Sequence, residues 1–268
     1  MTDLRTRMPA HALVEKVVSL RGTRDLRELP LGIVRPSRDA MAWLRGIRGE
    51  QEAARRLAAL GPEWVVLHSI PIGQKESDVD HLVIGPAGVF VVNSKRHRNA
   101  RVWVAGGRLL VNGRRTDHIR NSAFEATRIA AILQRAGHAV PVTPIVAISG
   151  ARDLTVRATP EWKGTVVEVL HMPGLVRFLR KRGRRPAASV DVATLAALAA
   201  RPETWSTRPV PESELETLRR DYDLIDRGTT RWNVLVGVIG ALVAVGIVAL
   251  GYTLLGQVVS GLLMSLTR

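Results

Sequence analysis

The stretch from Val79 to Lys95 reads VDHLVIGPAGVFVVNSK and carries the clearest structural signal in the chain. Two apolar runs, Val79–Ile84 and Val89–Ser94, flank a turn sequence of glycine, proline, alanine and glycine. Valine-rich runs of this length on either side of a glycine and proline turn are typical of β-strands. The stretch therefore predicts two antiparallel strands that pair across the turn.

Three polar side chains stand at the open end of this predicted hairpin. Successive strand residues point to opposite faces, so Asn93 and Lys95 share a face. Pairing across the turn would bring Asp80 close to Asn93. A carboxylate, an amide oxygen and an ammonium group then form one cluster. Asp80 can bind a hard metal ion there, and Lys95 can orient or deprotonate a water molecule and stabilise charge on a phosphate.

The segments around the hairpin alternate between helical and strand patterns. Before the hairpin the sequence predicts an amphipathic helix over His11–Leu20, a proline-punctuated loop, a helix over Arg38–Leu60 and a strand over Trp64–Ile70. After it the sequence predicts a hairpin of Arg101–Ala105 and Arg108–Val111, a helix over Arg120–Arg135, strands over Pro144–Ser149 and Val166–Leu170, and helices over Leu175–Arg182 and Val190–Ala200. This order predicts a mixed α/β protein.

The region of about residues 40–150 resembles the nuclease-related domain (NERD) family, a branch of the PD-(D/E)XK nucleases. The segments that carry the resemblance are Gly46-Ile47-Arg48-Gly49-Glu50, the run from Val79 to Val92, and Ser94-Lys95. The resemblance implies a restriction-endonuclease-like mixed sheet flanked by helices, and metal-dependent cleavage of phosphodiesters. It also implies Mg²⁺ or Mn²⁺ held by Asp80, Glu50 and Asn93, with Lys95 as the fourth catalytic residue.

One position departs from the family pattern, because Asn93 stands where the family usually has an acidic residue two positions before the lysine. An asparagine can bind Mg²⁺ through its carbonyl oxygen, but it brings no charge and cannot act as a base, so metal affinity should fall. Two interpretations stay open. The domain is either a metal-dependent nuclease or a degenerate module that binds nucleic acid or protein without cleavage.

Several nearby residues could compensate for the missing acid. Glu50 would restore a second carboxylate if its helix reaches the cluster. Glu76, Asp78 and His97 are further substitutes by their nearness in sequence. We expect Asn121 and Glu125, on the helix 120–135, to lie on the polar face of that helix instead of at the cluster.

The composition sets limits on function. The 268 residues include no cysteine, which excludes disulfides, thiolate metal sites and a cysteine nucleophile. The net charge of +15 indicates a polyanionic partner, either nucleic acid or an anionic membrane surface. We found no phosphate-binding Walker loop, no dinucleotide fingerprint, no nucleophile elbow and no HExxH motif in the sequence.

Basic residues are densest in two runs, and both are candidates for contact with nucleic acid. The candidate residues are Arg96, Arg98, Arg101, Arg180, Lys181, Arg182, Arg184 and Arg185. Attraction to anionic lipid, or simple solvation of a helix end, would explain the same charges.

The C-terminal part has the composition of a membrane anchor. Val234–Leu255 is a run of 22 residues without a charge, and a helix needs about 20 such residues to span a bilayer. Only Arg268 is charged after Asn233, so the preceding part carries +14. Four arginines just before the run (219, 220, 227 and 231) predict a cytoplasmic N-terminal domain. Small residues between Gly237 and Gly246 suggest a self-association face. The arginine-rich composition suggests a bacterial source, hence a single-pass protein of the bacterial cell membrane.

These patterns divide the chain into six segments. They are an N-terminal helix and loop (1–37), the nuclease-related domain (38–150), a C-terminal extension of that domain (151–210), a charged juxtamembrane helix (211–231), a transmembrane helix (232–255) and a short apolar tail (256–268).

Overall fold

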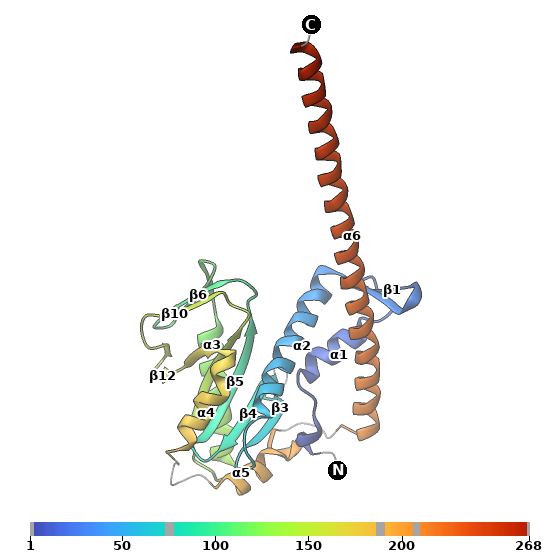
Figure 1. Cartoon of the computed structure of the whole chain (residues 1–268). Helices are drawn as coiled ribbons and strands as arrows, with labels where there is room; N and C mark the ends of the chain where they lie inside the picture. Colours follow the sequence, from blue (N-terminus) through green and yellow to red (C-terminus); the bar gives the residue numbers. More distant parts are fainter. Residues whose placement is uncertain (1–2, 73–77, 186–190, 206–209, 267–268) are drawn as a thin grey trace.

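A computed structural model describes residues 3–72, 78–185, 191–205 and 210–266. It shows an α/β domain from which one long helix projects (Figure 1). The main sheet has five strands in the order β13-β9-β5-β4-β3, formed by Glu168–His171, Val142–Ser149, Gly88–Arg96, Asp78–Gly85 and Val65–Pro71. β13, β9 and β5 run parallel, whereas β4 and β3 are antiparallel to their neighbours. The predicted mixed sheet is therefore confirmed.

The hairpin predicted from the Val79–Lys95 stretch is present. β4 and β5 pair from Gly85 opposite Gly88 to His81 opposite Val92. Gly88 adopts a φ of 122°, which suits glycine, at the exit of the turn. The ring of Trp64 occupies the space that a Cβ on Gly85 would need, so a side chain at position 85 would displace the tryptophan.

Helices cover both faces of the main sheet. α2 (Arg38–Leu57) and α4 (Leu175–Gly183) pack on one face against Phe90 and Val92. α3 (His118–Arg135) and α5 (Val192–Ala199) pack on the other face against Leu82 and Val91. Valine and isoleucine dominate β4, β5 and β9 because both faces of these strands are buried. Apart from Val190, which lies outside the described residues, these helices and strands match the predicted ones, with small shifts at their ends.

A smaller sheet extends the domain beyond the end of β5. Its strands are β10 (Asp153–Val156), β6 (Arg101–Ala105), β7 (Arg108–Val111) and β8 (Arg114–Thr116), in that order. β11 (Glu161–Trp162) and β12 (Thr165–Val166) form a two-stranded ribbon beside it. The strand expected over Val166–Leu170 is therefore divided between β12 and β13. Val102, Val104 and Leu109 join the start of α3 in a separate apolar cluster.

The N-terminal segment packs against the long helix. α1 (His11–Ser19) lies beside α2, and both contact the first half of α6 (Glu212–Leu266). The proline-punctuated loop predicted after α1 is in fact a hairpin of β1 (Leu26–Leu29) and β2 (Ile33–Pro36). Short 3-10 turns complete the chain at Leu4–Thr6, Pro30–Gly32, Met172–Gly174 and Pro202–Trp205.

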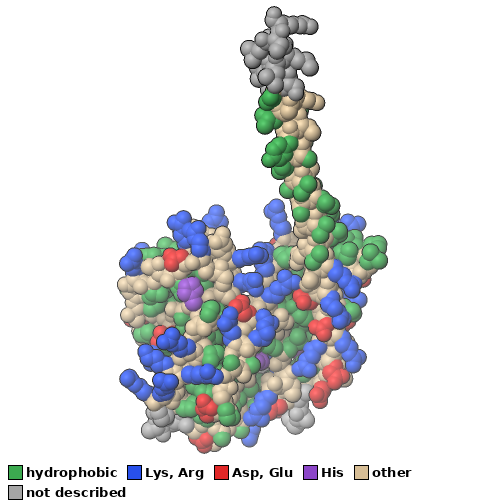
Figure 2. Space-filling view, in the orientation of Figure 1, with side chains coloured by type: hydrophobic (Ala, Val, Ile, Leu, Met, Phe, Trp, Pro, Cys, Tyr) green, Lys and Arg blue, Asp and Glu red, His purple; other side chains and the backbone are tan. Residues whose placement is uncertain are grey.

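α6 is one unbroken helix of 55 residues, whereas the sequence suggested a juxtamembrane helix and a separate span. Leu215, Tyr222 and Ile225 on its first half are buried in the domain. Its second half is apolar, unburied and long enough to cross a membrane. Figure 2 shows this half standing clear of the domain, with lysine and arginine side chains spread over the domain surface around its base.

Candidate metal and phosphodiester site

The candidate site lies where the hairpin of β4 and β5 opens. The last paired residues are His81 and Val92, and Asp80 follows one step beyond. Its Oδ2 accepts hydrogen bonds from the backbone nitrogen of Ser94 at 2.7 Å and from the Ser94 hydroxyl at 3.0 Å. The Asp80 carboxylate thus accepts a hydrogen bond from Ser94 where the backbone pairing of β4 and β5 has ended. These hydrogen bonds hold the Asp80 side chain buried beside β5.

The strand on the other side of Asp80 is also irregular. Ser69 of β3 lies across from Asp80, between the pairs His68–His81 and Ile70–Val79, and its φ is 51°. The Ser69 hydroxyl accepts a hydrogen bond from the backbone nitrogen of His11 at 2.8 Å instead. A non-glycine residue in this left-handed region requires support from its surroundings, and such residues are often found at functional sites.

Asn93 is directed to α3. Its Nδ2 donates to Oε2 of Glu125 at 2.6 Å and to the hydroxyl of Ser122 at 3.3 Å. Because the amide nitrogen is engaged, the carbonyl oxygen of Asn93 is the atom that could ligate a metal. The expectation that Glu125 lies on the polar face of its helix, away from the cluster, is wrong. Asn121 is exposed there, as expected.

Glu50 reaches the cluster from the opposite face. Gly49 of α2 lies against β5, where a Cβ would stand 3.5 Å from the Cβ of Arg96. The close approach of helix and strand buries the next residue, Glu50. Burial, and then the charge of Asp80, raise the pKa of Glu50 to about 9, although the Lys95 ammonium acts in the opposite direction.

The pKa of Glu125 is also raised. Burial raises its pKa to about 7, against the hydrogen bond from Asn93, which lowers it. The charges of Asp80 and Lys95 act on it with opposite signs. The carboxyl groups of Glu50 and Glu125 therefore both respond to the charge of Asp80, which indicates a cluster that lacks sufficient positive charge.

Lys95 is the positive group of this cluster. Its side chain is half-buried, and it makes no hydrogen bond or ion pair with the described part of the chain. Its charge lowers the pKa of both Glu50 and Glu125. An ammonium group that is near carboxylates but not paired with one can still contact a phosphate.

Two of the substitutes suggested by nearness in sequence, Asp78 and His97, are engaged with other partners. Asp78 forms a shielded ion pair with Arg7 at 3.1 Å. His97 Nε2 lies 3.1 Å from Nε2 of His118, and the two rings stack. Burial and Lys95 lower the pKa of both imidazoles, that of His118 to about 3, so the pair is neutral. Glu76 falls outside the described residues.

The donor chemistry of the site suits a hard divalent cation. Asp80, Glu50 and Glu125 offer carboxylate oxygens and Asn93 offers an amide oxygen, which are the ligands that Mg²⁺ and Mn²⁺ prefer. Within the ranges that the structure describes, no three acidic or histidine side chains already converge closely enough to hold a metal ion. An ion held by three carboxylates would therefore require these side chains to move together.

The candidate basic residues separate into two surfaces at opposite ends of β5. Arg96 and Arg98 line a cleft with Arg45, Arg48 and Asn233, and Arg96 directly follows Lys95 in β5. Arg101 lies exposed nearby on β6. We call this surface the proximal cleft. Eight residues of β5 separate its end at Arg96 from Gly88, about 26 Å of strand.

The other surface, here called the distal cleft, lies beside Ala87 at the turn that precedes β5. Lys181, Arg182, Arg184 and Arg185 line it. Some of its charge is already used within the protein, because Arg182 pairs with Glu168 at 2.6 Å and Arg180 donates to the carbonyl of Ala59. Of the two clefts, the proximal one lies at the end of β5 that carries Lys95.

One region of the chain matches a known protein family. Residues 45–149 match the family model of the nuclease-related domain. This range contains Glu50, Asp80, Asn93, Lys95 and the newly located Glu125. No curated protein and no solved structure matches the chain.

Proposed function

Because residues 45–149 form a nuclease-related domain, we propose that the protein is a membrane-anchored, divalent-metal-dependent phosphodiesterase that acts on nucleic acid. The observation that carries the proposal is the hydrogen bond between Asn93 and Glu125. It brings a carboxylate from α3 to the position whose own acidic residue is missing, and so supplies the negative charge that Asn93 lacks.

The metal ligands in this proposal are Asp80, Glu50 and the amide oxygen of Asn93, with Glu125 behind Asn93. Mg²⁺ or Mn²⁺ bound there would lower the pKa of a bound water and neutralise charge on the scissile phosphate. The raised pKa values of Glu50 and Glu125 support the assignment, since a cation would relieve the repulsion that contributes to them.

Lys95 contacts the phosphate in this proposal. It stands near the end of β5, its charge acts on Glu50 and Glu125, and Arg96 of the proximal cleft follows it directly in the chain. A compact ammonium group can stabilise negative charge on a phosphate oxygen or orient the attacking water. Arg96, Arg98 and Arg101 would bind flanking phosphates of the same strand, which requires no particular base sequence.

The distal cleft would serve as a second phosphate-binding surface. Lys181, Arg184 and Arg185 are exposed there. A duplex or a long single strand that occupied both clefts would have to follow β5 along its length, about 26 Å. Because the distal cleft lies this far from Lys95, we expect it to contribute to affinity but not to turnover.

The apolar half of α6 would anchor the enzyme in the membrane. Arginines flank the domain end of the span, and this supports a cytoplasmic domain by the positive-inside rule. A bacterial cell membrane is the proposed location, and the small residues from Gly237 to Gly246 would permit self-association of spans.

A second candidate function is a binding module without catalysis. Asn93, and the fact that no metal-ready group of acids or histidines exists among the described residues, favour it. In this alternative the domain holds nucleic acid at the membrane through the two clefts.

Metal titration separates the two functions. The full-length protein in detergent micelles would be titrated with Mn²⁺ by calorimetry, and cleavage of single- and double-stranded DNA and RNA would be followed in parallel. The enzyme requires saturable Mn²⁺ binding that disappears in Asp80→Ala, and Mn²⁺-dependent cleavage that disappears in Lys95→Ala. Nucleic-acid binding without Mn²⁺ binding by the wild type would establish the binding module instead.

A further inference from the structure

The tip of the β1–β2 hairpin exposes an apolar side chain that the domain itself does not use. Leu31 is 86% exposed, the highest value for a large apolar residue in the described part of the chain. Its backbone is left-handed, with φ at 64° and ψ at 22°. Leucine rarely adopts this conformation, so the surroundings must hold it there.

α6 provides that support. Arg231 donates from Nη1 to the carbonyl oxygen of Leu31 at 2.7 Å. The same guanidinium lies where a Cβ on Gly32 would stand, and Gly228 gives room to Val34. The tip is therefore fixed on two successive turns of α6, at residues 228 and 231.

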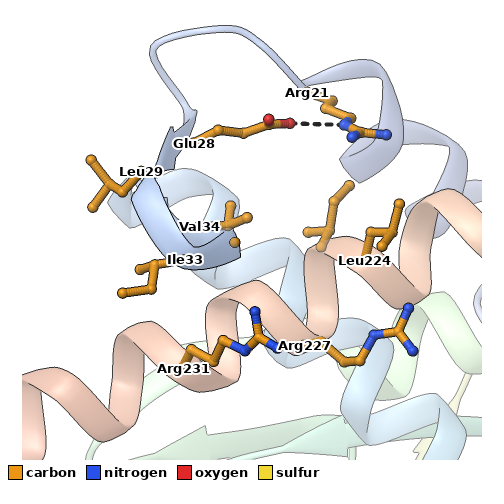
Figure 3. A pocket seen from close by; sticks show the side chains of 10 residues that line it. Arg21, Glu28, Leu29, Ile33, Val34, Leu224, Arg227 and Arg231 are labelled. Atoms are coloured by element: carbon orange, nitrogen blue, oxygen red, sulfur yellow. Dashed lines mark hydrogen bonds and ion pairs between the residues drawn. The ribbon is translucent and has the colours of Figure 1, made fainter.

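This attachment places the tip next to the start of the apolar span. Val234 follows Arg231 by three residues, about 4.5 Å along a helix. In Figure 3, Leu29 and Ile33 extend from the hairpin on the side toward which α6 runs to Arg231, while Glu28 turns back to its ion pair with Arg21. Leu29 and Ile33, which flank the tip, thus lie on the span side of the hairpin.

The polar groups around the tip have the character of a membrane interface. The guanidinium of Arg35 lies 5.5 Å from the ring centre of Trp232. Arg227 and Arg231 line the cavity between the hairpin and α6. Tryptophan and arginine at the end of an apolar helix are typical of the headgroup region, where arginine can contact lipid phosphates.

We propose that the β1–β2 tip is a membrane wedge, in which Leu31 enters the boundary between headgroups and acyl chains of the leaflet where α6 begins its span. Leu29 and Ile33 lie beside it in that boundary. The inference rests on the proposed membrane span of α6. A second point of lipid contact beside a single helix restricts the tilt of the domain relative to the membrane plane, and it holds the proximal cleft, which Asn233 also lines, near the membrane surface.

The absence of cysteine from the chain makes a direct test practical. Single-cysteine variants Leu31→Cys, Leu224→Cys and Val243→Cys of the full chain would carry an environment-sensitive fluorophore in vesicles of phosphatidylcholine and phosphatidylglycerol. Val243 lies in the span and reports its insertion. Leu224 is an exposed leucine on α6, ten residues or about 15 Å before Val234, and serves as the matched control.

The wedge requires that lipid-attached quenchers near the headgroup reach the label at position 31, and that aqueous iodide quenches it several-fold less than the label at 224. If iodide quenches both labels equally while the label at 243 stays in the acyl chains, the wedge is disproved and the span stands. If the label at 243 is also exposed to iodide, the proposed membrane anchor itself fails. Protection of position 31 without lipid quenching would assign the tip to a protein contact and would also overturn the wedge.

Discussion

The amide nitrogen of Asn93 on β5 lies 2.6 Å from a carboxylate oxygen of Glu125 on α3. This contact joins a strand residue to a helix residue 32 positions later in the chain. The negative charge that is missing at position 93 of β5 is therefore supplied next to it by the Glu125 carboxylate of α3.

The variant Asn93→Asp should bring two carboxylates, at 93 and 125, into direct contact. Without metal we expect a loss of stability of about 1–3 kcal/mol from like-charge repulsion and the lost hydrogen bond. With Mg²⁺ or Mn²⁺ the extra charged ligand should raise metal affinity at least about tenfold. Thermal unfolding with and without Mg²⁺ would show both effects. Unchanged melting temperatures in both conditions would contradict the contact.

The variant Glu125→Gln should lower metal affinity by about tenfold while it preserves the fold. Glutamine keeps an acceptor oxygen for Asn93 but removes the charge. Glu52→Gln is the matched control, because Glu52 lies on α2 in a partly exposed ion pair with Arg56, which should contribute little to stability. Manganese binding measured by calorimetry for both variants decides the point, and equal affinities would remove Glu125 from the site.

Glu50→Gln should stabilise the metal-free protein at neutral and alkaline pH. The folded pKa of Glu50 is raised to about 9, above its unfolded value, so the folded state binds the proton more tightly. Stability of the wild type therefore falls as pH rises from about 4.5 to about 9. The gain in Glu50→Gln should be near zero at pH 4.5 and should grow steadily up to about pH 9. Denaturant unfolding at several pH values, with EDTA present, measures it. A gain that does not change with pH would indicate a packing effect instead.

The two clefts should differ in their effect on turnover. Arg96→Ala with Arg98→Ala removes two exposed charges from the proximal cleft, and Arg184→Ala with Arg185→Ala removes two from the distal cleft. Each pair should reduce the slope of log affinity against log salt by up to about 2. Only the proximal pair should also lower kcat, because Arg96 directly follows Lys95 at the end of β5. Equal losses of kcat would mean that both clefts act on the reacting phosphate.

Truncation after Asn233 should give a folded protein that stays in solution, because every residue of α6 whose burial is described and that is buried precedes it. Truncation before Glu212 should give an unstable or aggregated protein, since Leu215, Tyr222 and Ile225 complete the apolar cluster with α1 and α2. Circular dichroism and gel filtration of the two products would distinguish these outcomes. A stable domain without residues 212–233 would show that α6 only tethers the domain.

The hairpin of β4 and β5 was predictable because its signal is local. Alternation of side chains and a four-residue turn determine the register, and the register determines that Asp80 stands at the open end. The Asn93–Glu125 contact was not predictable in this way, because it depends on how α3 rotates against β5. One local sign existed: Ser122 and Glu125 are three residues apart and border the buried stripe of Ala126 and Ile129.

The β1–β2 hairpin and the continuity of α6 were not predicted, for other reasons. Each strand of the hairpin has four residues, and the sequences LREL and IVRP show little alternation. In α6 the composition changes sharply near Trp232, which suggested two segments. No proline lies between Glu212 and Leu266, so nothing in the backbone interrupts the helix at that change.

The unbroken α6 leaves the domain no hinge between Thr229, which is buried in the domain, and Val234, where the apolar run begins. With the anchor in a bilayer, the catalytic cluster would stay at one height above the lipid and move only laterally. Its search for substrate would then be two-dimensional, and a nucleic acid would be cleaved only if it came to the membrane surface. Length and stiffness of the substrate near that surface would then matter more than its base sequence.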